Sequence, residues 1–203
     1  MLMEPPPLTQ DQIAMHNSLF SKGWRLTEGE LHLDGKDLAK PNWFSRRRLN
    51  KARGLFLRTI DINTTNWQAM LAIGKIEQRL GNKEAALQWF LKAREFEPVN
   101  TSLAKEASLT ASSLGDYEMA TRIAEEAIEN NPDDPALRVN SGLANILAGN
   151  CDTALRRFRE AAALEPSRAV NSQLVSYVTK IIAGQVPKPE KESDIIDSIK
   201  SAS

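Results

Sequence analysis

The chain has few of the residues that most often carry catalysis, metal binding or covalent cross-links. Its 203 residues include one cysteine, Cys151, and two histidines, His16 and His32. A single cysteine excludes a disulfide within the chain, and neither histidine lies at the spacing that zinc sites use. The sequence has no glycine-rich phosphate loop and no HExxH or CxxC motif. We therefore expect a protein that is not an enzyme, with no metal and no cofactor, and we interpret Cys151 as a packing residue.

The chain also lacks a net charge and a long apolar run. Its 26 basic residues balance 26 acidic residues, so the overall basicity typical of nucleic-acid-binding domains is absent. No apolar stretch approaches the roughly 20 residues that a membrane-spanning helix needs. The N-terminal sequence MLMEPPPLTQ has no basic region followed by an apolar core, as a secretory signal would. We expect no membrane span and a cytoplasmic location.

What the chain does contain is a repeat of 34 residues. Four positions recur at this spacing. The first is an alanine (Ala52, Ala86, Ala120, Ala154), and the second lies four residues further on (Phe56, Phe90, Ala124, Phe158). The third is a small residue 12 positions before the last three alanines (Gly74, Ser108, Gly142), and the fourth ends each unit (Thr64, Pro98, Pro132, Pro166). Within each unit the apolar residues recur at helical spacing, which predicts two amphipathic helices. Because such helices cannot bury their apolar faces alone, the units must stack.

The period and these residue types resemble the tetratricopeptide repeat, a helix–turn–helix unit of 34 residues. The segment 67–100 matches the family pattern best, followed by 101–134 and 135–168. The resemblance implies an all-α superhelical solenoid of helix pairs with a C-terminal capping helix. The expected pairs are 67–80 with 83–96, 101–114 with 117–130, and 135–148 with 151–164, and the expected capping helix lies within 169–184. We expect flexible segments at 1–8 and 185–203.

The first unit, residues 9–66, departs from this pattern. Ala52 follows Gly23 by 29 residues, whereas Ala86 follows Gly74 by 12, which indicates an insertion of 17 residues at about 26–42. The Asp34–Gly35 pair within it is compatible with a β-hairpin or with a plain loop. In the regular units we expect each glycine to face the alanine of its partner helix, and the phenylalanines to fill the space between neighbouring units.

The resemblance also implies a binding groove, because the first helix of each unit lines a concave surface that holds a peptide or a partner helix. The residues that map to this surface are Leu71, Lys75, Gln78, Lys105, Leu109, Val139, Asn140, Leu143, Ile146 and Tyr177. Their apolar members would form an interaction patch unless the C-terminal helix or tail covers them, and both alternatives stand. One sub-class of the family binds the acidic C-termini of chaperones with a set of lysine, arginine and asparagine side chains. This chain matches that set poorly, so we do not expect this function.

These observations favour a protein-interaction module that serves as an adaptor, an assembly factor or a chaperone-like scaffold for a protein or peptide partner. A run of basic residues offers nucleic-acid binding as an alternative, and its members are Arg46, Arg47, Arg48, Lys51 and Arg53. We favour the solvated face of a long helix, which makes nucleic acid an unlikely partner. The acidic cluster at 125–134 is interpreted in the same way. A third alternative is self-assembly through the last helix or Ile195–Ile199, and we expect a monomer or a weak homo-oligomer.

Overall fold

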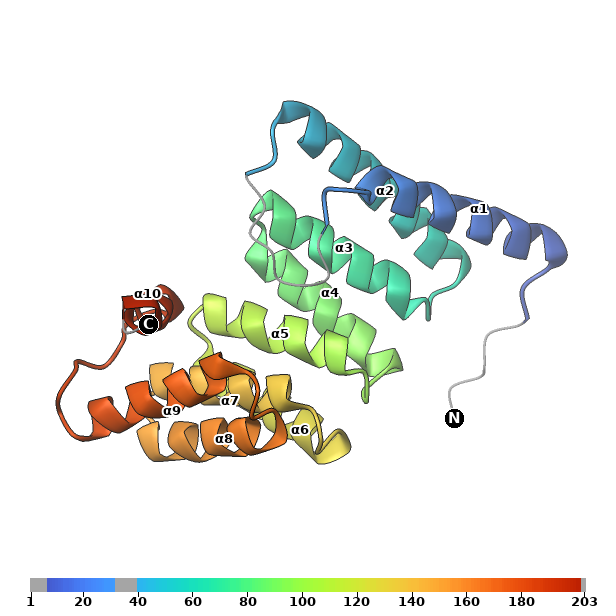
Figure 1. Cartoon of the computed structure of the whole chain (residues 1–203). Helices are drawn as coiled ribbons and strands as arrows, with labels where there is room; N and C mark the ends of the chain where they lie inside the picture. The colour runs from blue at the N-terminus through green and yellow to red at the C-terminus, as the bar shows by residue number, and fades with distance from the viewer. Residues whose placement is uncertain (1–6, 32–39, 202–203) are drawn as a thin grey trace. The chain divides into compact units, whose positions relative to one another are not determined.

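The computed structural model describes residues 7–31 and 40–201, and all regular elements of these residues are α-helices (Figure 1). They are α1 (Gln10–Thr27), α2 (Trp43–Ile62), α3 (Trp67–Leu80), α4 (Lys83–Phe96), α5 (Thr101–Ser113), α6 (Tyr117–Asn130), α7 (Pro135–Leu147), α8 (Cys151–Leu164), α9 (Ala169–Ile182) and α10 (Glu192–Ser201). The expected all-α fold of helix pairs is confirmed. Within the described residues no helix is long and apolar enough to span a bilayer. His32 and the Asp34–Gly35 pair of the proposed hairpin lie outside the described residues.

The helices form two compact units, residues 1–97 with α1 to α4 and residues 98–203 with α5 to α10. In the first unit α1 packs against α2, α2 against α3, and α3 against α4. In the second unit each helix from α5 to α9 packs against the next one, and α5 also contacts α7. Consecutive helices thus pack against each other in both units, and the turns that join the helices from α2 to α9 are short, as the repeat predicts.

Short polar side chains fix where these helices begin. The side chain of Asn66 accepts a hydrogen bond from the Ala69 amide at 2.8 Å, and Asn100 caps α5 in the same way. Asn82 is the residue before α4, but its side chain makes no capping hydrogen bond. Its Nδ2 donates to the buried Glu77 carboxylate at 2.6 Å, so this side chain ties the turn to α3 instead. Gly81 ends α3 with φ of 92°, a conformation that a residue with a Cβ adopts at a cost.

The glycines of the repeat make room for an aromatic ring. A Cβ on Gly74 would lie 2.4 Å from the ring of Phe90, and one on Gly142 would lie 2.5 Å from the ring of Phe158. Each ring lies over the glycine of its own helix pair. Phe158 also belongs to a cluster with Leu174 and Val178 of the following helix α9, as expected for a ring between neighbouring units. Only glycine leaves enough space here, because a Cβ would lie closer to the ring than atoms can approach without a shift.

In two other helix pairs the residue at the glycine position again matches the size of the residue at the phenylalanine position. On α1 and α2 a Cβ on Gly23 would lie 2.8 Å from the Phe56 ring, so this pair is built like the later ones despite the residues inserted between its helices. On α5 and α6 the ring is replaced by Ala124, and the glycine by Ser108. The Ser108 hydroxyl donates to the Ala120 carbonyl at 2.9 Å, which satisfies the buried hydroxyl.

The C-terminal segment that was expected to be flexible contains helix α10. The chain leaves α9 at Gly184, turns in a wide loop and ends in this short helix, coloured dark red in Figure 1. Helix α10 packs against α9, and Ile195 at its centre has 0% of its surface exposed. An isolated helix of this length is barely stable in water, so its apolar contacts with the second unit hold it in place.

Candidate partner-binding groove

The ten residues predicted to line a groove are distributed over both units. Leu71, Lys75 and Gln78 lie half-buried on α3 of the first unit. The other seven lie on α5, α7 and α9 of the second unit: Lys105, Leu109, Val139, Asn140, Leu143, Ile146 and Tyr177. Most of the apolar residues of the predicted surface lie in the second unit. The packing of that unit decides whether a partner could reach them.

The apolar surface of the second unit is a wall made by α7 and α9. Ile146 and Tyr177 are buried in a cluster that includes Phe158 of α8, while Val139 and Leu143 pack against this cluster and remain half-buried. Ile195 of α10 is a member of the same cluster. Helix α10 thus lies on the part of the predicted apolar patch that α7 and α9 provide.

The two polar residues of the predicted surface in the second unit, Lys105 and Asn140, differ in their contacts. The Nζ atom of Lys105 lies 2.6 Å from Oδ2 of Asp134, and Oδ1 of Asp134 accepts a hydrogen bond from the Ala136 amide at 2.9 Å. Lys105 thus forms an ion pair with Asp134, the N-cap residue of α7, and so links α5 to the start of α7. Leu109 lies half-buried on α5, and Asn140 stands beside Leu143 on the wall itself.

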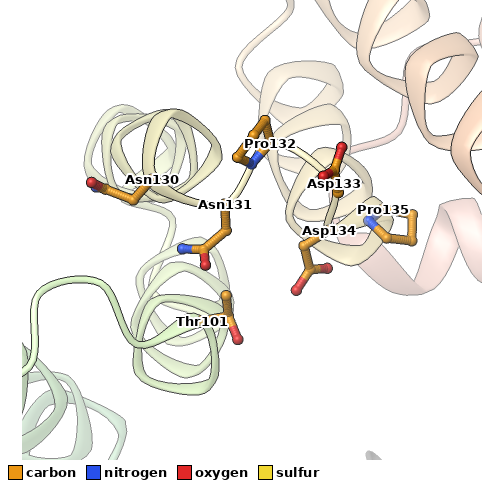
Figure 2. Close-up of a pocket in the computed structure, with 7 residues that line it drawn as sticks. All are labelled: Thr101, Asn130, Asn131, Pro132, Asp133, Asp134 and Pro135. Atoms are coloured by element: carbon orange, nitrogen blue, oxygen red, sulfur yellow. The ribbon is translucent and has the colours of Figure 1, made fainter.

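The loop between α6 and α7 borders a shallow pocket of about 590 Å³, lined by Thr101 and by residues 130–135 (Figure 2). Figure 2 shows Asn131 and Asp134 of the loop facing Thr101 of α5. The amide of Asn131 donates to the Val99 carbonyl at 3.0 Å, and Asp134 is engaged as described, so the loop's polar groups serve its own structure. In the described parts of the chain no group of three acidic, histidine or cysteine side chains could hold a metal.

The acidic residues of α6 belong to an ion-pair network. Glu125 pairs with Arg157 of α8, which also pairs with Glu160 at 2.7 Å. Burial alone would lower the pKa of Arg157, but the hydrogen bonds and charges of Glu160 and Glu125 outweigh it and raise that pKa. Glu125 also accepts a hydrogen bond from the Ser141 hydroxyl of α7, so the network joins α6, α7 and α8. This arrangement gives Glu125 a structural role and explains part of the acidic cluster seen in the sequence.

The basic run on α2 is divided between surface and structure. Arg48 donates to the carbonyls of Leu26 and Glu28 at 3.2 and 3.1 Å, and Arg53 donates to the Glu77 carboxylate at 2.7 Å. Arg46, Arg47 and Lys51 remain exposed. Beside them Trp43 and Phe44 are 63% and 72% exposed. Three exposed cations and two exposed aromatic rings therefore lie in the N-terminal part of this helix.

Sequence reasoning did not single out Asn171, which lies at the start of α9 and is 1% exposed. Its Nδ2 donates to the carbonyls of Ala161 and Glu165 at 3.3 and 3.4 Å, which ties α9 to the end of α8. A lone asparagine near a helix start resembles an ordinary capping residue in the sequence. Only the packing of α7, α9 and α10 shows that it faces the groove region.

Comparison with known proteins identifies the fold. Models of the tetratricopeptide repeat match residues 68–100 and 106–169. No curated protein sequence matches the chain significantly. The crystal structure of MamA superposes with a TM-score of 0.69 at 12% identity, covering 93% of this chain and 90% of that one. MamA from Desulfovibrio magneticus gives 0.66 at 13% identity over 94% and 97% of the two chains.

A third similar structure is YrrB, described as a tetratricopeptide repeat protein with an unusual peptide-binding site. It superposes with a TM-score of 0.60 at 18% identity and covers 77% of this chain and 79% of that one. At such identities the likeness concerns the fold alone. The two family matches, together with the repeat columns and the ring-over-glycine packing, identify residues 68–100 and 106–169 as tetratricopeptide repeats.

Proposed function

We propose that this protein is a non-enzymatic scaffold, an adaptor or chaperone-like assembly factor of the cytoplasm, which holds a helix or peptide of a protein partner against the α7–α9 wall. The observation that carries the proposal is that this wall already accepts a helix. Ile195 of α10 is wholly buried on it. The peptide-binding site named for YrrB, a protein of the same fold, supports the choice of a peptide-like ligand.

The wall suits recognition because it is preformed. The side chains of Val139 and Leu143 stand on a helix that is fixed by its cap and by the ion pair of Lys105 with Asp134. Little conformational entropy is then lost on the protein's side when a ligand binds. Affinity would come from burial of apolar partner side chains on Val139 and Leu143, and Asn140 would supply a polar contact at the rim.

The test is affinity capture by the full-length chain with Leu143→Glu as the variant. A carboxylate at this half-buried position opposes burial of an apolar partner, so the dissociation constant should rise at least about tenfold. Ile182→Glu is the matched control, because Ile182 lies on α9 with 47% of its surface exposed. Circular dichroism must first show that both variants keep the helix content of the wild type.

The expected result is a protein that the wild type and Ile182→Glu capture and that Leu143→Glu loses. Titration calorimetry with the purified partner then measures the change in affinity. Equal capture by both variants, with both folded, would place the binding surface elsewhere and contradict the proposal.

A second candidate function rests on the exposed Trp43 and Phe44 beside Arg46 and Arg47. Aromatic rings that stack on bases and cations that pair with phosphates are the features of single-strand nucleic-acid binding. The affinity for a labelled oligonucleotide should then fall steeply as salt is raised and should be lost on replacing both arginines by glutamate. Binding that is absent at low salt, or that survives the double replacement, would eliminate this candidate.

A further inference from the structure

The groove under α10 is occupied but not filled. A cavity of about 230 Å³ remains between α7, α9 and α10, and its walls include Leu143, Leu174 and the three isoleucines of α10. Of these isoleucines Ile195 is wholly buried, whereas Ile196 is 43% exposed. Apolar side chains of α7, α9 and α10 thus border a partly open cavity that α10 leaves unfilled.

A polar group in the same wall is also unsatisfied. Asn171 lines the cavity, and its Oδ1 is a buried acceptor without a hydrogen-bond partner. The orientation of the amide is fixed because its Nδ2 donates to the carbonyls of Ala161 and Glu165. A buried acceptor without a donor costs free energy that a ligand with a suitably placed N–H or O–H would recover. A ligand that replaces α10 could therefore gain both by filling the cavity and by supplying a donor to Asn171.

Helix α10 is held in a way that allows release. It has 10 residues, which is too short for a stable isolated helix, and it follows a connecting segment that contains Gly184, Pro187 and Pro189. The Asp194 carboxylate accepts hydrogen bonds from the amides of Glu190 and Lys191, so its N-terminal turn is closed by its own residues. Its contacts with the second unit include those of Ile195 and Ile199 with the apolar cluster.

From these observations we propose that α10 is an internal competitor for the groove, and that the partner is an amphipathic helix that displaces it. The partner's buried face carries apolar residues four apart, like Ile195 and Ile199, with at least one bulky residue that also donates a hydrogen bond. Tryptophan combines the two properties, because its ring fills the cavity and its N–H reaches an acceptor such as Asn171. This inference rests on the proposed function and specifies the partner of the same site.

The first experiment measures binding of a fluorescent peptide with the sequence of residues 189–201 to three full-length proteins. These are the wild type, the open variant Ile195→Asp/Ile199→Asp, and the control Lys200→Asp, which places an aspartate on the exposed side of α10. The tether keeps α10 at a high effective concentration beside the groove. The wild type and the control should therefore bind the peptide about tenfold more weakly than the open variant does.

The second experiment changes the peptide. The Ile199→Trp peptide should bind the open variant about three to ten times more tightly than the parent peptide, because it buries more apolar surface and supplies a donor. The Ile199→Phe peptide, which adds a ring without a donor, should fall between them. Adding the Ile199→Trp peptide to the unaltered wild type should also speed hydrogen exchange in residues 192–201, which reports displacement without any change to the protein.

Three results would overturn the inference: no peptide binding by the open variant, equal binding by all three proteins, or unchanged hydrogen exchange in α10. A concentration-dependent dimer of the wild type that Leu143→Glu abolishes would also overturn it, since α10 would then occupy a second copy. The two proposals fail in different ways. If only the competitor role is wrong, partner capture stays sensitive to Leu143→Glu and is equal for the wild type and the open variant. If the scaffold function is wrong, Leu143→Glu leaves capture unchanged.

Discussion

Replacing one glycine by alanine should have opposite effects at two positions of the first unit. Gly74 on α3 faces the buried ring of Phe90, and a Cβ there would lie 2.4, 2.6 and 2.9 Å from three ring atoms. Gly54 on α2 is exposed, and a Cβ there would meet nothing within 4 Å. Both glycines lie inside helices, so the intrinsic gain in helix propensity on adding a methyl group is the same.

The magnitudes follow from this comparison. Alanine is favoured over glycine in a helix interior by about 1 kcal/mol, so Gly54→Ala should raise the free energy of unfolding by about 0.5–1 kcal/mol. At Gly74 the same gain is opposed by overpacking, which costs about 1–3 kcal/mol in a typical core. Phe90 is wholly buried and the close atoms belong to a rigid ring, so we take the upper end of that range. Gly74→Ala should then lower the free energy of unfolding by about 2 kcal/mol.

Urea and thermal unfolding followed by circular dichroism measure both effects. For a chain of this size the midpoint temperature changes by about 2–4 °C per kcal/mol, so the two variants should differ by roughly 6–12 °C. The double variant Gly74→Ser/Phe90→Ala reproduces the Ser108 and Ala124 arrangement of the next helix pair. It should be less destabilised than the sum of its single changes. Equal midpoints for Gly74→Ala and Gly54→Ala, or strict additivity in the double variant, would refute the ring-over-glycine argument.

Three further predictions concern polar contacts. Arg48→Ala removes a donor from two carbonyls and should lower the free energy of unfolding by about 1 kcal/mol, whereas Arg46→Ala, at an exposed site, should change it by less than about 0.5 kcal/mol in urea titrations. Asp134→Ala removes the cap of α7 and should cost about 1–2 kcal/mol by the same assay. Burial would raise the pKa of Glu160, but hydrogen bonding and charge from Arg157 lower it below its ordinary 4.5. Its stabilising effect is therefore present above that value and lost as the pH falls through the lowered pKa. Glu160→Gln should be less stable than the wild type at neutral pH, with a difference that closes in acid; a constant difference in thermal melts at both pH values would contradict this.

The positions of the helices could be predicted from the sequence because the information is local. The helices α3, α4, α6 and α8 have the expected bounds, α5 and α7 end one residue earlier than expected, and α9 lies within the expected range. The 34-residue period sets the spacing of the helix pairs, and residues such as Asp134 with Pro135 mark a helix start. The period is read along the sequence and a capping signal acts within one turn of helix, so neither requires knowledge of the packing.

Packing partners could not be predicted in the same way. The repeat columns identify Gly74 and Phe90 as positions under constraint, but they do not say that the two meet across one helix pair. Asn82 has the residue type and the position of a helix cap, yet its side-chain amide donates to the Glu77 carboxylate. A buried carboxylate without a hydrogen-bond donor costs more free energy than an exposed helix start, which water can satisfy. These choices depend on which groups are buried together, and that is decided by the tertiary structure.

The groove shows why a binding surface is harder to predict than a fold. A residue that contacts a partner and a residue that packs in the core follow the same apolar pattern on a helix, so Leu143 and Ile146 look alike in the sequence. The structure separates them, because Ile146 is 1% exposed within the cluster while Leu143 stands at the edge of a cavity. Across this cavity from Leu143 lie Ile195 and Ile199 of α10. In the sequence these isoleucines follow a segment with two prolines, which predicts a flexible tail and not a helix. Under the proposed competition, the docking of α10 and the availability of the groove are two aspects of a single equilibrium. A partner helix would shift that equilibrium by fitting the surface of α7 and α9 better than α10 does.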